Sequence, residues 1–129
     1  MDKSVKKEKW LFYYLKSCDT CQRILKGMHP HNFHLINIKE FPLTKPQLEE
    51  LSALSGSYEA LFNKNAQKLR LLEINSKPKS EEDYKKLLLE HYTYLKRPVA
   101  VINDSIFIGN SSLTVAELYQ KTIALNKCH

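Results

Sequence analysis

The chain has 129 residues, of which 43% are hydrophobic and 26% charged, values typical of one globular domain, and we predict a single domain over residues 1–129. Its longest apolar run, residues 10–15, is too short to span a membrane or to form a signal-peptide core, so no membrane partner is expected. The net charge is +6, but the lysines and arginines are scattered without a nucleic-acid-binding motif, so we expect no direct nucleic-acid binding.

The first third of the chain predicts a β-α-β unit. Residues 1–9 are polar and rich in lysine, and we expect a flexible basic leader there. Residues 10–15 are aromatic and aliphatic without alternation, which is typical of a strand buried on both faces. A helical pattern follows and stops at His29-Pro30, and a second short strand is expected over residues 33–38. The two strands should be parallel, with a right-handed crossover.

Residues 44–95 predict an all-helical insertion of about four helical segments. Thr44 has the residue type of an N-cap, and Gly56 is placed to end that helix. Residues 69–74 are ambiguous between helix and loop. Ser80 and the three acidic residues after it open another helix. The apolar side of that helix is expected to consist of Leu87, Leu88 and Tyr92.

After the insertion, the chain predicts a hairpin and a last helix. Residues 99–102 form a strand, residues 103–105 a tight turn and residues 106–108 the return strand. Thr114 is expected to cap the final helix. The element order is therefore β-α-β, helices, β-β-α, which indicates an α/β fold.

The motif Cys18-Asp19-Thr20-Cys21 joins the first predicted strand to the first predicted helix. This position puts Cys18 at a helix N-terminus, where unpaired backbone N–H groups and the helix dipole favour the reactive thiolate. Cys21 lies close enough to trap an oxidised Cys18 as a disulfide. Such a motif is typical of redox chemistry in a reducing compartment, and we predict a cytoplasmic protein.

Other interpretations of the cysteines remain open. The motif could simply be two ordinary buried thiols. Zinc would need two more ligands, and the nearest histidines lie roughly 12 Å or more away along the helix, so we predict no metal site. Those histidines are His29, His31 and His34. Cys128 is expected to be an exposed free thiol, with a resolving role as the alternative.

The order of these elements resembles the thioredoxin fold. With its helical insertion, the chain is similar to the arsenate reductase family of the glutaredoxin-coupled (ArsC) type, which includes the Spx regulators. Five segments carry the resemblance: Cys18–Arg23, Phe41–Leu48, Leu61–Asn65, Leu95–Val99 and Ile106–Gly109. The resemblance implies a thioredoxin-like β-α-β…β-β-α core with an all-helical insertion at about residues 44–95.

In that family, the first cysteine is the nucleophile and three arginines bind an oxyanion. The resemblance implies the nucleophile role for Cys18, the anion-binding role for Arg97 and a cis peptide bond at Pro98, with an edge-strand proline as the alternative. The other two arginine positions hold Asn63 and Gly109-Asn110. The predicted catalytic residues are Cys18, Cys21 and Arg97. The predicted substrate-binding residues are Ser17, Asn63, Lys64 and Pro98.

The resemblance implies two alternative functions. As an enzyme, the protein would use Cys18 to reduce an oxyanion or a disulfide, with glutathione as co-substrate and glutaredoxin or thioredoxin as partner, and without a bound cofactor. As an Spx-like regulator, it would bind RNA polymerase under the control of a Cys18–Cys21 disulfide. A redox-inert relative that keeps the fold as a binding module is a third alternative.

Overall fold

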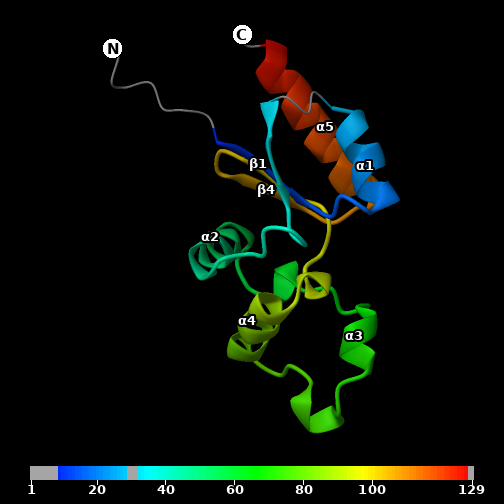
Figure 1. Cartoon of the computed structure of the whole chain (residues 1–129). Helices are drawn as coiled ribbons and strands as arrows, with labels where there is room; N and C mark the ends of the chain where they lie inside the picture. Colours follow the sequence, from blue (N-terminus) through cyan, green and yellow to red (C-terminus); the bar gives the residue numbers. More distant parts are fainter. Residues whose placement is uncertain (1–8, 29–31, 128–129) are drawn as a thin grey trace.

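The computed structural model describes residues 9–28 and 32–127 and contains a four-stranded mixed sheet with helices on both faces (Figure 1). The strand order is β2-β1-β3-β4, with β1 parallel to β2 and antiparallel to β3, and β3 antiparallel to β4. The strands are β1 (Trp10–Tyr14), β2 (His34–Asn37), β3 (Val99–Ile102) and β4 (Ser105–Ile108). The sheet confirms the predicted β-α-β and β-β-α units.

Helices α1 (Asp19–Lys26) and α5 (Ser112–Lys127) lie on one face of this sheet, side by side (Figure 1). The Tyr119 hydroxyl of α5 donates a hydrogen bond to the Ile24 carbonyl oxygen of α1 over 2.9 Å. Ser111 caps α5, because its hydroxyl oxygen accepts a hydrogen bond from the Thr114 N–H over 3.1 Å. The prediction that Thr114 is the cap was therefore wrong, and Thr114 lies inside the first turn.

The insertion lies on the other face and contains three α-helices and three 3-10 helices within the described residues. They are α2 (Lys45–Ser55), η2 (Glu59–Leu61), α3 (Gln67–Arg70), η3 (Ile74–Ser76), α4 (Glu81–Glu90) and η4 (Tyr92–Tyr94). Tyr92 therefore belongs to η4 rather than to the apolar side of α4, where we had expected it. The ambiguous residues 69–74 contain the end of α3 and a turn in which Leu71 is exposed.

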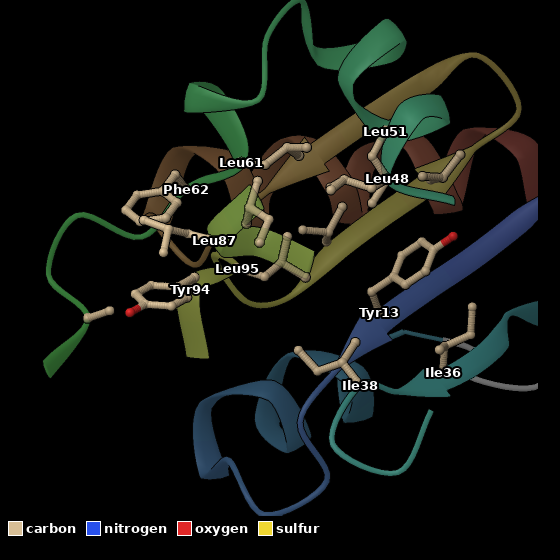
Figure 2. Packing of buried hydrophobic residues seen from close by; sticks show 14 residues of the cluster. Tyr13, Ile36, Ile38, Leu48, Leu51, Leu61, Phe62, Leu87, Tyr94 and Leu95 are labelled. Atoms are coloured by element: carbon tan, nitrogen blue, oxygen red, sulfur yellow. The ribbon is translucent and has the colours of Figure 1, made fainter. Parts of the chain in front are cut away.

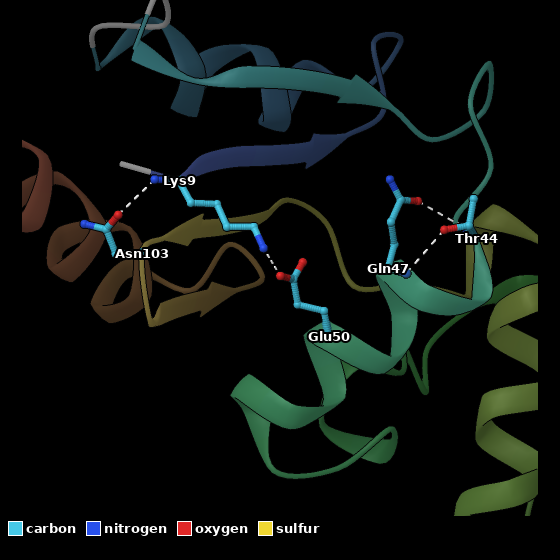
Figure 3. A network of polar contacts seen from close by, with 5 residues as sticks. All are labelled: Lys9, Thr44, Gln47, Glu50 and Asn103. Atoms are coloured by element: carbon cyan, nitrogen blue, oxygen red, sulfur yellow. Dashed lines mark hydrogen bonds and ion pairs between the residues drawn. The ribbon is translucent and has the colours of Figure 1, made fainter. Parts of the chain in front are cut away.

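Helix α2 begins and ends at the residues that the sequence predicts. The Thr44 hydroxyl oxygen accepts a hydrogen bond from the Gln47 N–H over 3.2 Å, and the Gln47 side-chain oxygen accepts one from the Thr44 N–H over 2.9 Å (Figure 3). This reciprocal pair is a capping box. Gly56 follows the helix with a φ of 98°, a left-handed conformation that glycine adopts without steric penalty.

The hydrophobic core has one part on each face of the sheet. On the insertion side, Tyr13, Val99 and Val101 of the sheet pack with side chains of the insertion (Figure 2). The insertion residues of this part include Leu48, Leu51, Leu61, Phe62, Leu87, Tyr94 and Leu95. On the other side, Phe12 and Ala100 pack against α1 and α5. Strand β3 is buried at all four positions because both of its faces are covered.

The hairpin between β3 and β4 turns at Asn103 and Asp104, one residue shorter than predicted, because Ser105 already belongs to β4. Asn103 has a φ of 56°, which asparagine tolerates better than most residues. Its side-chain oxygen accepts a hydrogen bond from the Lys9 N–H, and the Lys9 ammonium group pairs with Glu50 of α2 (Figure 3). Lys9, the last residue of the predicted leader, therefore contacts the fold, and the flexibility of the leader stays a prediction.

Residues 1–8 of the predicted leader lie outside the described residues, as do His29, His31 and Cys128. Among the residues that the structure describes, no helix is long and apolar enough to cross a membrane.

Candidate active site around Cys18

Cys18 occupies the N-cap position of α1, at the point where the chain leaves β1. Its N–H donates a hydrogen bond to the Leu15 carbonyl oxygen over 2.9 Å, and its carbonyl oxygen accepts one from the Gln22 N–H over 3.1 Å. The Cys18 side chain itself is half-buried, whereas Cys21 is fully buried against the sheet. The predicted placement of Cys18 at a helix N-terminus is confirmed.

The pKa of the Cys18 thiol lies below the ordinary value for cysteine. Partial burial on its own would raise this pKa, but hydrogen bonds from the backbone N–H of Cys21, the Cys21 thiol and the backbone N–H of Thr20 stabilise the thiolate. The positive charge of Arg97 lowers the pKa further. Cys18 is therefore the more acidic and the more accessible of the two cysteines in the motif.

The Cys21 thiol has the opposite character. Burial raises the pKa of Cys21 to about 11, and its hydrogen bond with Cys18 and the Cys18 charge act in the same direction. Both cysteines are free thiols in this structure. The geometry therefore pairs an accessible thiolate with a buried, protonated thiol that donates a hydrogen bond to it.

Arg97 approaches the cysteines from the segment that precedes β3. The Arg97–Pro98 peptide bond is cis, as the resemblance implied. Since Pro98 directly precedes β3, which lies between β1 and β4, the alternative of an edge-strand proline was wrong. Two nitrogens of the guanidinium group, Nε and Nη1, are buried and have no hydrogen-bond partner among the described residues. Buried donors of this kind are costly unless a partner satisfies them, so they favour binding of an anion or a carbonyl oxygen.

Cys18 and Arg97 line one open pocket of about 500 Å³. The walls come from four parts of the chain that are distant in sequence: the start of α1, the segment after η2, the segment before β3, and the turn from β4 into α5. The remaining lining residues are Asn63, Asn65, Lys96, Ile108, Gly109, Asn110, Ser111 and Thr114. The pocket thus combines one sulfur nucleophile, two basic side chains and several neutral polar groups.

Three of the predicted substrate-binding residues are not among those that line this pocket: Ser17, Lys64 and Pro98. The Lys64 ammonium group forms an ion pair with Glu59 and lies 6.0 Å from the centroid of the Tyr84 ring. Lys64 therefore lines a neighbouring pocket rather than the one that contains Cys18. Ser17 is exposed and does not line the pocket either.

Asn63 is the predicted substrate-binding side chain that the structure does bring to the pocket. Its side-chain oxygen accepts a hydrogen bond from the Asn65 N–H over 3.0 Å. Sequence reasoning missed five lining residues: Asn65, Lys96, Ile108, Ser111 and Thr114. Lys96 had a signal, since it directly precedes Arg97, and it is the second basic residue among those that line the pocket.

Metal binding finds no support in the described residues, since no group of three histidine, cysteine, aspartate or glutamate side chains is arranged to hold an ion. His34, one of the three histidines that we weighed as zinc ligands, lies in β2 and is exposed.

A thiol at the start of the first helix and a cis-proline segment facing it define a thioredoxin-like redox protein. The ArsC family model matches residues 13–118, and the chain belongs to the ArsC family.

Solved structures of similar proteins agree with this assignment. An ArsC family related protein from Bacteroides fragilis is 26% identical, with a TM-score of 0.70 over 85% of this chain and 97% of that chain. A Staphylococcus aureus protein is 28% identical, with a TM-score of 0.67 over 86% of this chain and 97% of that chain. An arsenate reductase from Vibrio cholerae, with a TM-score of 0.70 over 91% of this chain and 99% of that chain, is 15% identical and shows the shared fold alone. No curated protein sequence matches the chain.

Proposed function

We propose that the protein is a thiol oxidoreductase in which Cys18 is the nucleophile and a glutathione-type thiol regenerates it. One observation carries this proposal: a half-exposed thiol of lowered pKa shares a pocket with a guanidinium group that has two nitrogens without a hydrogen-bond partner among the described residues. The thiolate is the reactive form of cysteine, and the guanidinium group stabilises negative charge beside it.

With a disulfide substrate, the reaction is two thiol–disulfide exchanges and a regeneration step. The Cys18 thiolate attacks one substrate sulfur, the S–S bond breaks, and the other sulfur leaves as a thiolate that takes a proton from water. A first glutathione thiolate displaces the bound half of the substrate and leaves a mixed disulfide between Cys18 and glutathione. A second glutathione thiolate then releases Cys18 as a thiolate, with oxidised glutathione as the product.

The pocket favours a disulfide over an oxyanion substrate. Arg97 is the only arginine that lines the pocket, and two of the other lining residues, Asn63 and Asn110, carry neutral amides. Each charge-assisted hydrogen bond to an anion is worth roughly 1.5–3 kcal/mol, so a site with one arginine binds an oxyanion far more weakly than a site with three.

Oxyanion reduction is the second candidate function, and the unpartnered N–H groups of Arg97 are the observation that favours it. In that reaction, the Cys18 thiolate would add to the central atom of the oxyanion, and one oxygen would leave as water. Glutathione would then attack the Cys18 sulfur, and the electron pair of the breaking bond would reduce the central atom by two electrons.

The contact between the Cys18 and Cys21 sulfurs supports a further alternative, in which Cys21 resolves the mixed disulfide and forms a Cys18–Cys21 disulfide. The Spx-like regulator, which would bind RNA polymerase in one redox state, needs that same disulfide. The two thiols lie in hydrogen-bond contact, which is the proximity that this alternative requires.

The proposal is tested by following glutathione-dependent reduction of hydroxyethyl disulfide, with and without added glutaredoxin. The wild-type protein should turn over, Cys18→Ser should not, and Cys128→Ser serves as the matched control that keeps the motif intact. Cys21→Ser should retain turnover if glutathione resolves the adduct and lose it if Cys21 does. Turnover by Cys18→Ser would refute the assignment of the nucleophile. Replacing the disulfide with arsenate in the same assay tests the oxyanion reaction.

A further inference from the structure

Strand β4 forms one edge of the sheet, and no strand of the described residues lies beyond it. The Gly109 N–H donates a hydrogen bond to the Pro98 carbonyl oxygen over 2.8 Å. Since hydrogen-bonded and non-hydrogen-bonded pairs alternate along an antiparallel ladder, the next pair, Val99 and Ile108, is not hydrogen-bonded. The backbone N–H and C=O groups of Ile108 therefore point away from β3, and those of Ile106 do the same two residues earlier.

A shallow groove of about 650 Å³ runs along this edge. Its floor is Ser105 to Phe107 of β4, and its sides are Leu54 of α2 and residues of α5 that include Glu117 and Gln120. All four residues of β4 are only half-buried, in contrast to the four buried residues of β3. The groove therefore lies along the edge of the sheet towards which the outward backbone groups of β4 point.

The groove leads to the Cys18 pocket. Ile108 and Gly109, which follow the groove residues along β4, line the pocket that contains Cys18. On α5, Thr114 lines the pocket and Glu117, one turn further on, lines the groove. The other edge strand, β2, contributes no residue to the Cys18 pocket. Of the two sheet edges, β4 is thus the one that continues into the candidate active site.

We propose that the substrate disulfide is carried by an extended peptide segment of a protein, which adds to β4 as a fifth strand and delivers its cysteine to Cys18. This inference rests on the proposed function of Cys18. An extended peptide is the occupant that matches alternating free N–H and C=O groups along a strand edge. Proteins usually block such an edge with lysine, proline or a bulge, whereas β4 has the sequence Ser-Ile-Phe-Ile and carries neither residue. The lysine that lines the groove, Lys121, comes from α5.

The test uses a seven-residue peptide of alternating threonine and valine with a central cysteine, whose sulfur is joined to nitrothiobenzoate in a mixed disulfide. The Cys18 thiolate attacks the cysteine sulfur, and nitrothiobenzoate leaves as a coloured thiolate that reports the rate. The matched probe has the same sequence with N-methyl groups on alternate residues, which removes hydrogen-bond donors from the backbone. The background rate from other thiols is measured in Cys18→Ser and subtracted.

The wild-type protein should react at least about tenfold faster with the plain peptide than with the N-methylated one, since each hydrogen bond is worth roughly fivefold. Ile106→Pro removes an outward N–H without removing a bond to β3, because proline is tolerated at such edge positions. This variant loses one hydrogen bond to the plain peptide, so it should lower the ratio about fivefold and leave the rate with dithiobis(nitrobenzoate), a small disulfide, unchanged. Equal rates with the two peptides in the wild-type protein would refute strand addition.

Two further outcomes are separated in the same experiment. If Cys18 reacts with the small disulfide but does not distinguish the peptides, strand addition fails and the proposed function stands, whereas failure to react with any disulfide refutes both. Hydrogen exchange of the wild-type protein gives a test that does not depend on the folding of a variant. The amides of Ile106 and Ile108 should become protected from exchange when the peptide is attached to Cys18. A wild-type dimer that Ile106→Pro converts to a monomer would show that a second copy occupies the edge, which overturns the inference.

Discussion

Replacing Cys21 with alanine removes a thiol whose ionisation differs between the two states of the protein. Between about pH 9 and pH 11, this thiol stays protonated in the folded protein and ionises in the unfolded chain. Burial raises the pKa of Cys21 from 9.0 to about 11. A raised pKa gives stability that is fully present below the unfolded value and is lost as the pH rises towards the folded value. Since pH 10 lies one unit above the unfolded pKa of 9.0, the free energy of unfolding should be about 1.4 kcal/mol lower there than below pH 9.

The assay is urea unfolding at pH 8 and pH 10 in a background of Cys18→Ala and Cys128→Ala, in which Cys21 is the only thiol. Burial, the largest cause of the raised pKa, is retained in this background, so most of the effect should remain. Between the two pH values, the protein that keeps Cys21 should lose about 1 kcal/mol more stability than the same protein with Cys21→Ala. An identical pH dependence in the two proteins would refute the buried, protonated state of Cys21.

Three further predictions concern the site and the core. The rate of Cys18 alkylation by iodoacetamide should rise with pH to a plateau, and the midpoint of this rise should lie below that of free cysteine because the pKa of Cys18 is lowered. Arg97→Met should move the midpoint upward. An unmoved midpoint would contradict the role of the arginine charge. Thr44→Ala should lower the free energy of unfolding in urea by about 1 kcal/mol, and Thr44→Ser should lower it much less. Equal losses in the two variants would argue against the cap. Phe62→Ala should cost about 3–5 kcal/mol, since this fully buried ring stacks on Tyr94, and a loss below about 1 kcal/mol would show that the insertion core is not packed as described.

Much of the fold could be predicted because local chemistry determines where its elements begin and end. Thr44 and Gly56 mark the two ends of α2 through hydrogen bonds and a backbone conformation that involve only near neighbours. The position of Cys18 at the start of α1 follows in the same way from the change of pattern after β1. The cap of α5 was misplaced because two hydroxyl residues, Ser111 and Thr114, compete for the same role three residues apart.

The composition of the pocket was harder to predict, because it depends on where side chains point and on contacts between distant segments. Lys64 carries the expected charge, but its ammonium group pairs with Glu59 and it lines the neighbouring pocket. Lys96 lines both that pocket and the one that contains Cys18. The family resemblance pointed to Gly109-Asn110. Ser111 and Thr114 also line the pocket, through the turn from β4 into α5, and no local pattern in the sequence predicts that contact.

The central claim is that Cys18 is a reactive thiolate that exchanges with glutathione. The most direct test is to equilibrate the protein with a series of reduced and oxidised glutathione mixtures at pH 7 and to locate every disulfide by peptide mass mapping. We predict glutathione on Cys18 or a Cys18–Cys21 disulfide, with a midpoint near the cytosolic range of roughly −220 to −320 mV. In Cys21→Ser, glutathione should accumulate on Cys18 alone. If Cys18 remains a free thiol across the whole series, the protein is redox-inert and the proposed chemistry is wrong.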